Sequence, residues 1–190
     1  MVARRTPYEA RLIVIDHRRS PLDSAATEHR VGYAASSAAA LELINDPRSA
    51  LLKRLPPADL TPERFRARNW WQGSDLCVVD DDDDLVMTSS NPLPPPAEPL
   101  PQAADIGLHP VMSCAMGGVG RAMYDPVIQR MKDMAGAAVI LSGDKDEGFP
   151  AGNVRPHPLP PGRGYSVDRK CGAHLTQTAF LLPPPVPETG

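Results

Sequence analysis

The sequence lacks any long hydrophobic run. Nowhere in its 190 residues do about 20 apolar residues follow one another, which is the length that a helix needs to cross a bilayer. The opening MVARRTPYEARLIVID also lacks the apolar core and small-residue cleavage site of a secretory signal. These absences exclude a membrane helix of ordinary length within the sequence, and they predict a cytoplasmic chain.

The sequence also has few cysteines, and its net charge is not positive. Cys77, Cys114 and Cys171 are odd in number and far apart, which argues against a disulfide framework or a zinc site and predicts reduced, buried thiols. The net charge of −3 and the pI near 5.9 leave no basic field to attract a phosphate backbone. Nucleic acid is therefore not favoured as a partner.

Two catalytic signatures are missing. No Gly-Lys-Ser or Gly-Lys-Thr occurs, although a phosphate-binding loop needs that lysine beside its glycines. Gly117-Gly118-Val119-Gly120 lacks the lysine and is interpreted as a flexible turn leading into a helix. The absence of Gly-x-Ser-x-Gly argues against a covalent hydrolase.

Proline, by contrast, is abundant. The chain has 23 prolines where average usage predicts about ten, so long irregular segments are expected. Six of them fall within residues 91–102, which cannot form a regular helix. The last residues, 183–190, are expected to form a loose tail.

Apolar runs and helical periodicity alternate along the rest of the chain. They predict an α/β fold with a mainly parallel sheet, and the chain length predicts one domain over residues 1–190 with a single core. Pro110 places the third strand at a sheet edge or a bulge. Strands are predicted over 11–16, 76–79, 106–112 and 137–141 and within 172–182, and helices over 36–55, with Pro47 as the start of a second segment, from Thr61 onward, and over 121–134.

The second strand runs directly into five aspartates, Asp80 to Asp84. Carboxylates at the tip of a buried strand are positioned to hold magnesium and polarise water, and Asp81 and Asp82 are the candidates. Like charges in a row are also typical of a solvated loop, and composition alone leaves the two interpretations equal.

Two further segments are candidates for binding. Trp70 and Trp71 precede the aspartate strand and either anchor their loop or form part of a groove. Arg163, in Gly-Arg-Gly, is a candidate for a mobile arginine loop, although the same tripeptide is common in turns.

The order of several motifs resembles one family. The segments RNWWQGSDLCVVDDDDDLV, GGVGRAMYDPVIQRM, ILSGDKDEG and NVRPHPLPPGRG are similar to the last ATPase module of the type VII secretion ATPases, the EccC proteins of the FtsK/SpoIIIE group. The match runs over about residues 12–185. It implies a P-loop NTPase-like, three-layer sandwich that is incomplete at its N-terminus, because the first strand, phosphate loop and helix of that module have no counterpart before Arg11.

The resemblance also implies chemistry and partners. Asp81 and Asp82 match the paired Walker B acids, which serve catalysis and magnesium binding in a family whose intact module uses ATP and magnesium. Asp80 and Asp83 stand where the family more often has valine and tyrosine. The implied partners are other secretion ATPase modules and small helical export substrates, and the implied location is cytoplasmic and peripheral to the inner membrane through the secretion complex.

Three hypotheses follow from the missing phosphate loop. The favoured one is a degenerate EccC-type module that contributes protein contacts, with no cofactor of its own. In the second, another chain supplies the phosphate loop, and Asp81 and Asp82 hold magnesium in a composite ATPase site. In the third, the chain is a gene remnant that does not fold stably, because a lost central strand exposes sheet edges.

Overall fold

The computed structural model describes residues 4–19, 28–81 and 99–179. The chain divides into two compact units, Met1–Met134 and Ala135–Gly190. Its length predicted a single core, whereas each unit contains a sheet of its own. No helix in the described part is long and apolar enough to span a bilayer.

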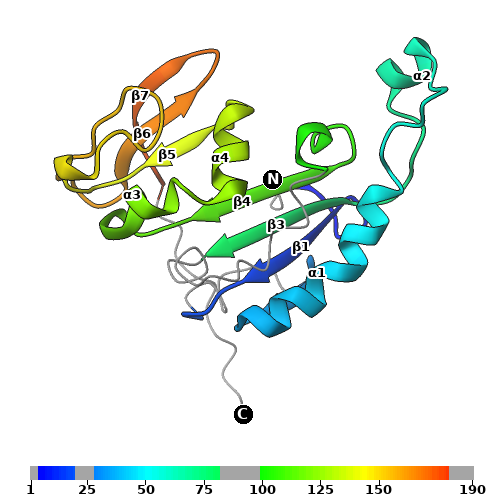
Figure 1. The fold of residues 1–190 in the computed structure, drawn as a ribbon, viewed down its shortest axis with the longest axis horizontal. Helices are drawn as coiled ribbons and strands as arrows, with labels where there is room; N and C mark the ends of the chain where they lie inside the picture. Colours follow the sequence, from blue (N-terminus) through cyan, green and yellow to red (C-terminus); the bar gives the residue numbers. More distant parts are fainter. Residues whose placement is uncertain (1–3, 20–27, 82–98, 180–190) are drawn as a thin grey trace. The chain divides into compact units, whose positions relative to one another are not determined.

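The first unit is built on a four-stranded sheet with the order β2-β1-β3-β4 (Figure 1). All neighbouring pairs are parallel, which confirms the predicted parallel sheet for this unit. Pro110 predicted an edge or a bulge, and within the part of the chain that the structure describes β4 is an edge strand of the sheet. The strands are β1 (Ala10–Ile15), β2 (Arg30–Ala34), β3 (Asp75–Asp81) and β4 (Leu108–Ser113).

The helices of this unit begin at the expected kinds of residue. Ser36 caps α1 (Ser37–Leu52), which continues through Pro47, so the predicted second segment from Pro47 is wrong. Thr61 caps α2 (Pro62–Ala67) by accepting a hydrogen bond from the Arg64 N–H, so this helix begins where it was predicted to begin. The single helix predicted over 121–134 is instead α3 (Val119–Ala122) and α4 (Pro126–Asp133), because Asp125 and Pro126 start a new helix.

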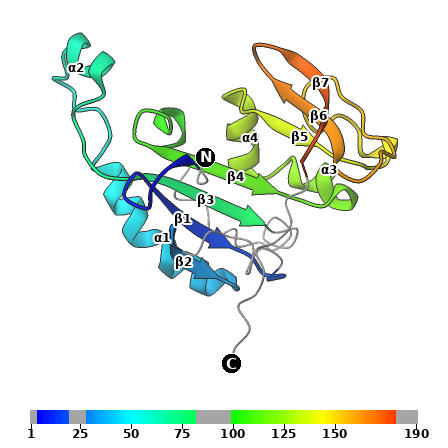
Figure 2. The ribbon, with the colours of Figure 1, turned by 180° about the vertical axis from the view of Figure 1, so that it is seen from behind.

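The two faces of the sheet are packed unequally. On the helix face, Ile13 and Ile15 are fully buried in the main core, together with residues of α1, α4 and the short 3-10 helix η3 (Leu100–Gln102). On the opposite face, the described residues form a small cluster around Leu12, Val14 and Cys77. The predicted three-layer sandwich needs helices on both faces, and it stays a prediction. Figure 2 shows α1 from behind, alongside β1 and β2.

The second unit is a three-stranded antiparallel sheet with the order β5-β6-β7. Strand β5 (Ala138–Ile140) lies within the predicted 137–141, but it pairs with β6 (Arg163–Asp168) in this separate sheet. Strand β6 was not predicted, because the proline-rich residues before it obscure its start. Strand β7 (Gly172–Gln177) falls within the predicted 172–182 and forms a hairpin with β6.

Candidate functional site

The two tryptophans lie at the end of the sheet where β3 and β4 begin. The Trp70 indole N–H donates to the Arg54 carbonyl at 2.8 Å, and the Trp71 indole N–H donates to the Asp105 carbonyl at 2.8 Å. Phe65 stacks on Trp70 with ring centres 5.5 Å apart. This geometry fits the anchoring interpretation, since each indole fastens a loop to backbone. The binding role of Trp70 and Trp71 stays a prediction.

The predicted catalytic acids lie at the other end of β3. Asp81 is the last residue of that strand, stands opposite Ser113 in the register with β4, and accepts a hydrogen bond from the Ser113 hydroxyl. Asp82 lies outside the described residues. Of the predicted pair, the structure therefore describes only Asp81. This residue lies at the carboxyl end of a parallel strand, where α/β proteins bind ligands.

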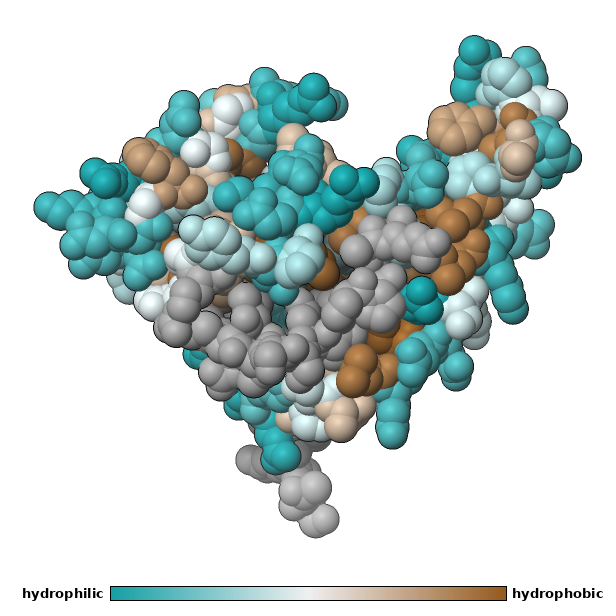
Figure 3. Space-filling model, viewed as in Figure 1, coloured by the Kyte–Doolittle hydropathy of each residue, from teal (hydrophilic) through white to brown (hydrophobic). Residues whose placement is uncertain are grey.

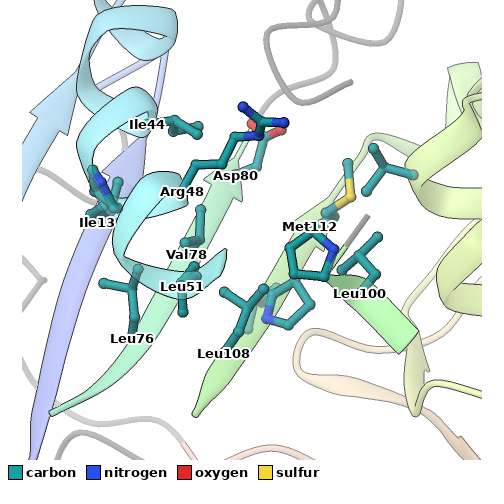
Figure 4. A pocket seen from close by; sticks show the side chains of 15 residues that line it. Ile13, Ile44, Arg48, Leu51, Leu76, Val78, Asp80, Leu100, Leu108 and Met112 are labelled. Atoms are coloured by element: carbon teal, nitrogen blue, oxygen red, sulfur yellow. The ribbon is translucent and has the colours of Figure 1, made fainter. Parts of the chain in front are cut away.

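Asp80 points to the helix face, because neighbouring residues of a strand point to opposite faces. Its side chain is only 3% exposed, and Figure 4 shows it beside Arg48 of α1. Asp80 is therefore not part of a solvated loop, although composition alone allowed that interpretation.

The pocket in Figure 4 lies on the helix face, between α1, η3 and α4. Among the described residues that line it, Arg48 and Asp80 are the only charged ones. Figure 3 shows apolar surface over α1 as well, where Leu41 is 41% exposed. The apolar side chains that line the pocket include Ile13, Ile44, Leu51, Leu76, Val78, Leu100, Leu108, Met112 and Val127.

A further carboxylate, Asp16, was not singled out from the sequence. Extending the register of β1 and β3, in which Ile15 pairs with Asp80, by one residue places Asp16 next to Asp81. Asp16 is fully buried, and its Oδ2 accepts a hydrogen bond from the Tyr33 hydroxyl at 2.9 Å. Burial raises the pKa of Tyr33, and this hydrogen bond raises it further. The signal that could have found Asp16 is the pattern shared with β3, an apolar strand that ends in aspartate.

This arrangement supplies hard oxygen donors but no phosphate cradle. Carboxylates and hydroxyls such as those of Asp81 and Ser113 suit magnesium. Within the described ranges, however, no cluster of three or more His, Cys, Asp or Glu side chains could hold a metal ion. The Gly117–Gly120 segment forms a 3-10 turn (Met116–Gly118) and the start of α3, which agrees with the helix-entry interpretation. A Cβ added at Gly117 or Gly120 meets nothing within 4 Å, so no close backbone approach requires glycine at either position.

Arg163 is the first residue of β6 and pairs with Gln177 of β7. The prediction of a mobile arginine loop is therefore wrong in its structural part, since the side chain belongs to a hairpin strand. The turn is formed by the preceding Gly162, whose φ is +73°. The binding role of Arg163 stays a prediction.

The cysteines differ in environment, and all three are free thiols. Cys77 is buried and Cys114 is half-buried, and burial raises the pKa of both. Cys171 is exposed, so the expectation of burial is wrong for this residue.

The chain is similar in sequence and structure to proteins of a known secretion system. No protein-family model matches the chain. The chain is 57% identical over 180 residues to the ESX secretion system protein EccC of Thermomonospora curvata, a match that covers 95% of this chain and 14% of that protein. The chain thus spans about one seventh of that relative's length.

Two solved structures of EccC from T. curvata align with the structure of this chain. One holds ATPases 2 and 3 in complex with a signal sequence peptide, and the other is the cytoplasmic domain. Both align with a TM-score of 0.90 and 56% identity over 95% of this chain, covering 33% and 21% of the respective solved chains.

The parallel sheet with carboxylate-tipped strands defines an α/β module of the ATPase type, with an FtsK/SpoIIIE-like fold. The chain belongs to the EccC-type ATPase modules of the ESX, or type VII, secretion systems and corresponds to the region of ATPases 2 and 3.

Proposed function

We propose that this chain acts in type VII secretion as a protein-binding module that contacts export signals or neighbouring ATPase modules and does not hydrolyse ATP by itself. The single observation that carries the proposal is the close structural match to EccC ATPases 2 and 3, a structure solved with a signal sequence peptide. By the same analogy, the proposed location is cytoplasmic, at the inner membrane through the secretion complex.

The chemistry of the strand tips supports the second half of the proposal. Asp81 and Ser113 supply oxygen atoms for a cation, but triphosphate binding also needs backbone amides and a lysine. The sequence offers no Gly-Lys-Ser or Gly-Lys-Thr for that purpose. Magnesium ligands without such a cradle leave the charge of the phosphates uncompensated.

The binding half is tested with the signal sequence peptide of the T. curvata complex as a fluorescent probe. We expect saturable anisotropy with the folded chain and none with a peptide of the same composition in scrambled order. In parallel, the chain is mixed with purified neighbouring ATPase modules and analysed by size-exclusion chromatography. Capture of neither the peptide nor a module by a cooperatively folded chain would contradict the proposal, and failure to fold cooperatively would favour the gene-remnant hypothesis.

The second candidate function is a composite ATPase site whose phosphate loop comes from another chain. The β1–β3 register favours it, because its extension by one residue places Asp16 next to Asp81, and two carboxylates at adjacent strand ends are suited to hold magnesium. Calorimetric titration with Mg-ATP distinguishes the two proposals. Micromolar binding by the chain alone that Asp81→Asn abolishes contradicts the binding-module proposal, and ATP hydrolysis that appears only with a loop-bearing module supports the composite site.

A further inference from the structure

A second cleft of the first unit lies between α1 and the beginnings of β1, β2 and β3, and its volume is about 190 Å³. It is distinct from the pocket in Figure 4, although Pro47, Leu51 and Leu76 line both. Together with Val31 and Ala50, these residues make most of its described wall apolar. A water molecule takes up about 30 Å³ in the liquid, so the cleft has room for a small organic molecule.

Two arginines give this cleft its charge. Arg11 of β1 and Arg54, just after α1, line it together with Ser74, and both arginines are half-buried. Among the described residues that line it there is no aspartate and no glutamate. The Arg11 side chain makes no hydrogen bond or ion pair with any described residue, so all its donors are available to a ligand.

Arg54 is held in place and still keeps donors. Its Nη1 donates to the carbonyls of Ser74 and Ile106, at 3.0 and 3.2 Å, whereas its Nε and Nη2 make no hydrogen bond to the described residues. Burial lowers the pKa of Arg54, and the Asp75 carboxylate opposes this shift. Asp75 already accepts a hydrogen bond from Arg5 Nη1 at 2.7 Å and lies 3.3 Å from His109 Nε2. The cleft therefore combines an excess of positive charge with partial burial.

We propose that this cleft binds a carboxylate that is attached to a short aliphatic group. Arg11 and Arg54 bind the carboxylate, whose two oxygen atoms match the parallel N–H groups of a guanidinium, and the apolar wall surrounds the aliphatic part. A phosphate fits less well, because its oxygen atoms point in all directions and some would face apolar side chains without a donor. The site lies at the opposite end of the strands from Asp81 and is independent of the proposed function.

The proposal is tested by titrating the whole chain with isovalerate at low ionic strength and following the backbone amide shifts of Val31, Ala50 and Ser74 by NMR. We expect saturable shifts of these amides with isovalerate and none with isovaleramide, which has the same shape but no charge. Absence of saturable shifts with isovalerate would overturn the proposal. Inorganic phosphate that shifts the same amides at equal or lower concentration would also overturn it, since the cleft would then be a general anion site.

Two variants locate the binding. Arg11→Gln keeps a polar side chain but removes one charge, and we expect isovalerate to bind about tenfold more weakly or worse. The matched control is Arg66→Gln, because Arg66 is exposed on α2 and does not line the cleft. Equal weakening by both substitutions would indicate attraction to the overall charge of the chain and would refute the proposal.

Ala50→Met fills the cleft without changing any charge, so it repeats the test if Arg11→Gln destabilises the fold. We expect the same weakening, with a melting curve that stays cooperative. If both variants bind isovalerate as tightly as the unmodified chain does, the proposal is wrong. The acetylated peptide Gly-Gly-Val separates two sources of the carboxylate. Binding of both probes supports the carboxyl terminus of a polypeptide as the ligand, and binding of isovalerate alone supports a free acid.

Discussion

The guanidinium carbon of Arg54 lies 4.4 Å from the centre of the Trp71 ring. Arg54 Nη1 also donates to the carbonyls of Ser74 and Ile106, at 3.0 and 3.2 Å. One arginine therefore connects the residues after α1 with the residues before β3 and β4. Because both tryptophans belong to this cluster, it fastens the end of the sheet that lies away from the carboxylates.

Truncating Trp71 should destabilise the first unit. Trp71→Ala removes the ring under Arg54 and the hydrogen bond to the Asp105 carbonyl, and we expect a loss of about 3 kcal/mol in the free energy of unfolding. Urea denaturation followed by circular dichroism measures it. Phe65→Ala removes a more exposed ring that stacks on Trp70 alone, and a loss as large as that of Trp71→Ala would argue against the anchoring role.

Gly107 should tolerate no side chain. Its φ is +72°, and an added Cβ comes within 2.6 Å of Asp75 Oδ1 and 2.7 Å of the Trp71 ring. We expect Gly107→Ala to cost about 2 kcal/mol or more, from backbone strain and crowding together. Gly172 is the matched control, because its φ is +77° but nothing lies within 4 Å of an added Cβ. Equal losses for both variants in thermal melts would rule out crowding at Gly107.

The three thiols should react at different rates. The thiolate is the reactive form, and burial raises the pKa of Cys77 and Cys114 as well as limiting access to them. We expect iodoacetamide at neutral pH to label exposed Cys171 first and buried Cys77 last, at least tenfold more slowly. Mass spectrometry of timed samples gives the order, and urea should abolish it. Early labelling of Cys77 in the folded chain would contradict the buried position of β3.

The hairpin of the second unit should depend on pH through Asp168. Its Oδ1 accepts hydrogen bonds from the Cys171 and Lys170 N–H groups, both at 2.8 Å, and these bonds lower the pKa of Asp168 below its ordinary value of 3.8. A carboxyl whose pKa is lowered in the folded state stabilises that state at pH values above its ordinary pKa. This contribution is lost as the pH falls through the pKa of the folded state.

Amide chemical shifts of Lys170 and Cys171, followed by NMR from pH 6 downward, measure this titration. We expect both amides to shift together below pH 3.8, and we expect Asp168→Asn to abolish the transition. A midpoint above 3.8 would contradict the lowered pKa of Asp168.

Local sequence was sufficient for the elements whose signals are short-range. The apolar runs in β1 and β3, the Thr61 cap of α2 and the edge position of Pro110 all follow from the residues themselves. Strand β2 was not predicted from the sequence, because its segment RVGYA is short and contains glycine and arginine. The placement of Asp81 at a strand tip also follows from sequence, since the strand and the aspartates are adjacent.

Only the tertiary structure determined which side chains share a face. Asp16 is 65 residues from Asp81 in the chain, and the parallel register of β1 and β3, extended by one residue, places the two at neighbouring strand ends. Because neighbouring residues of β3 point to opposite faces, Asp80 lies on the helix face beside Arg48, whereas Asp81 contacts Ser113. Such partners depend on strand order and register, which are set by long-range packing. The amino-acid sequence therefore shows which side chains are present but not which of them lie together.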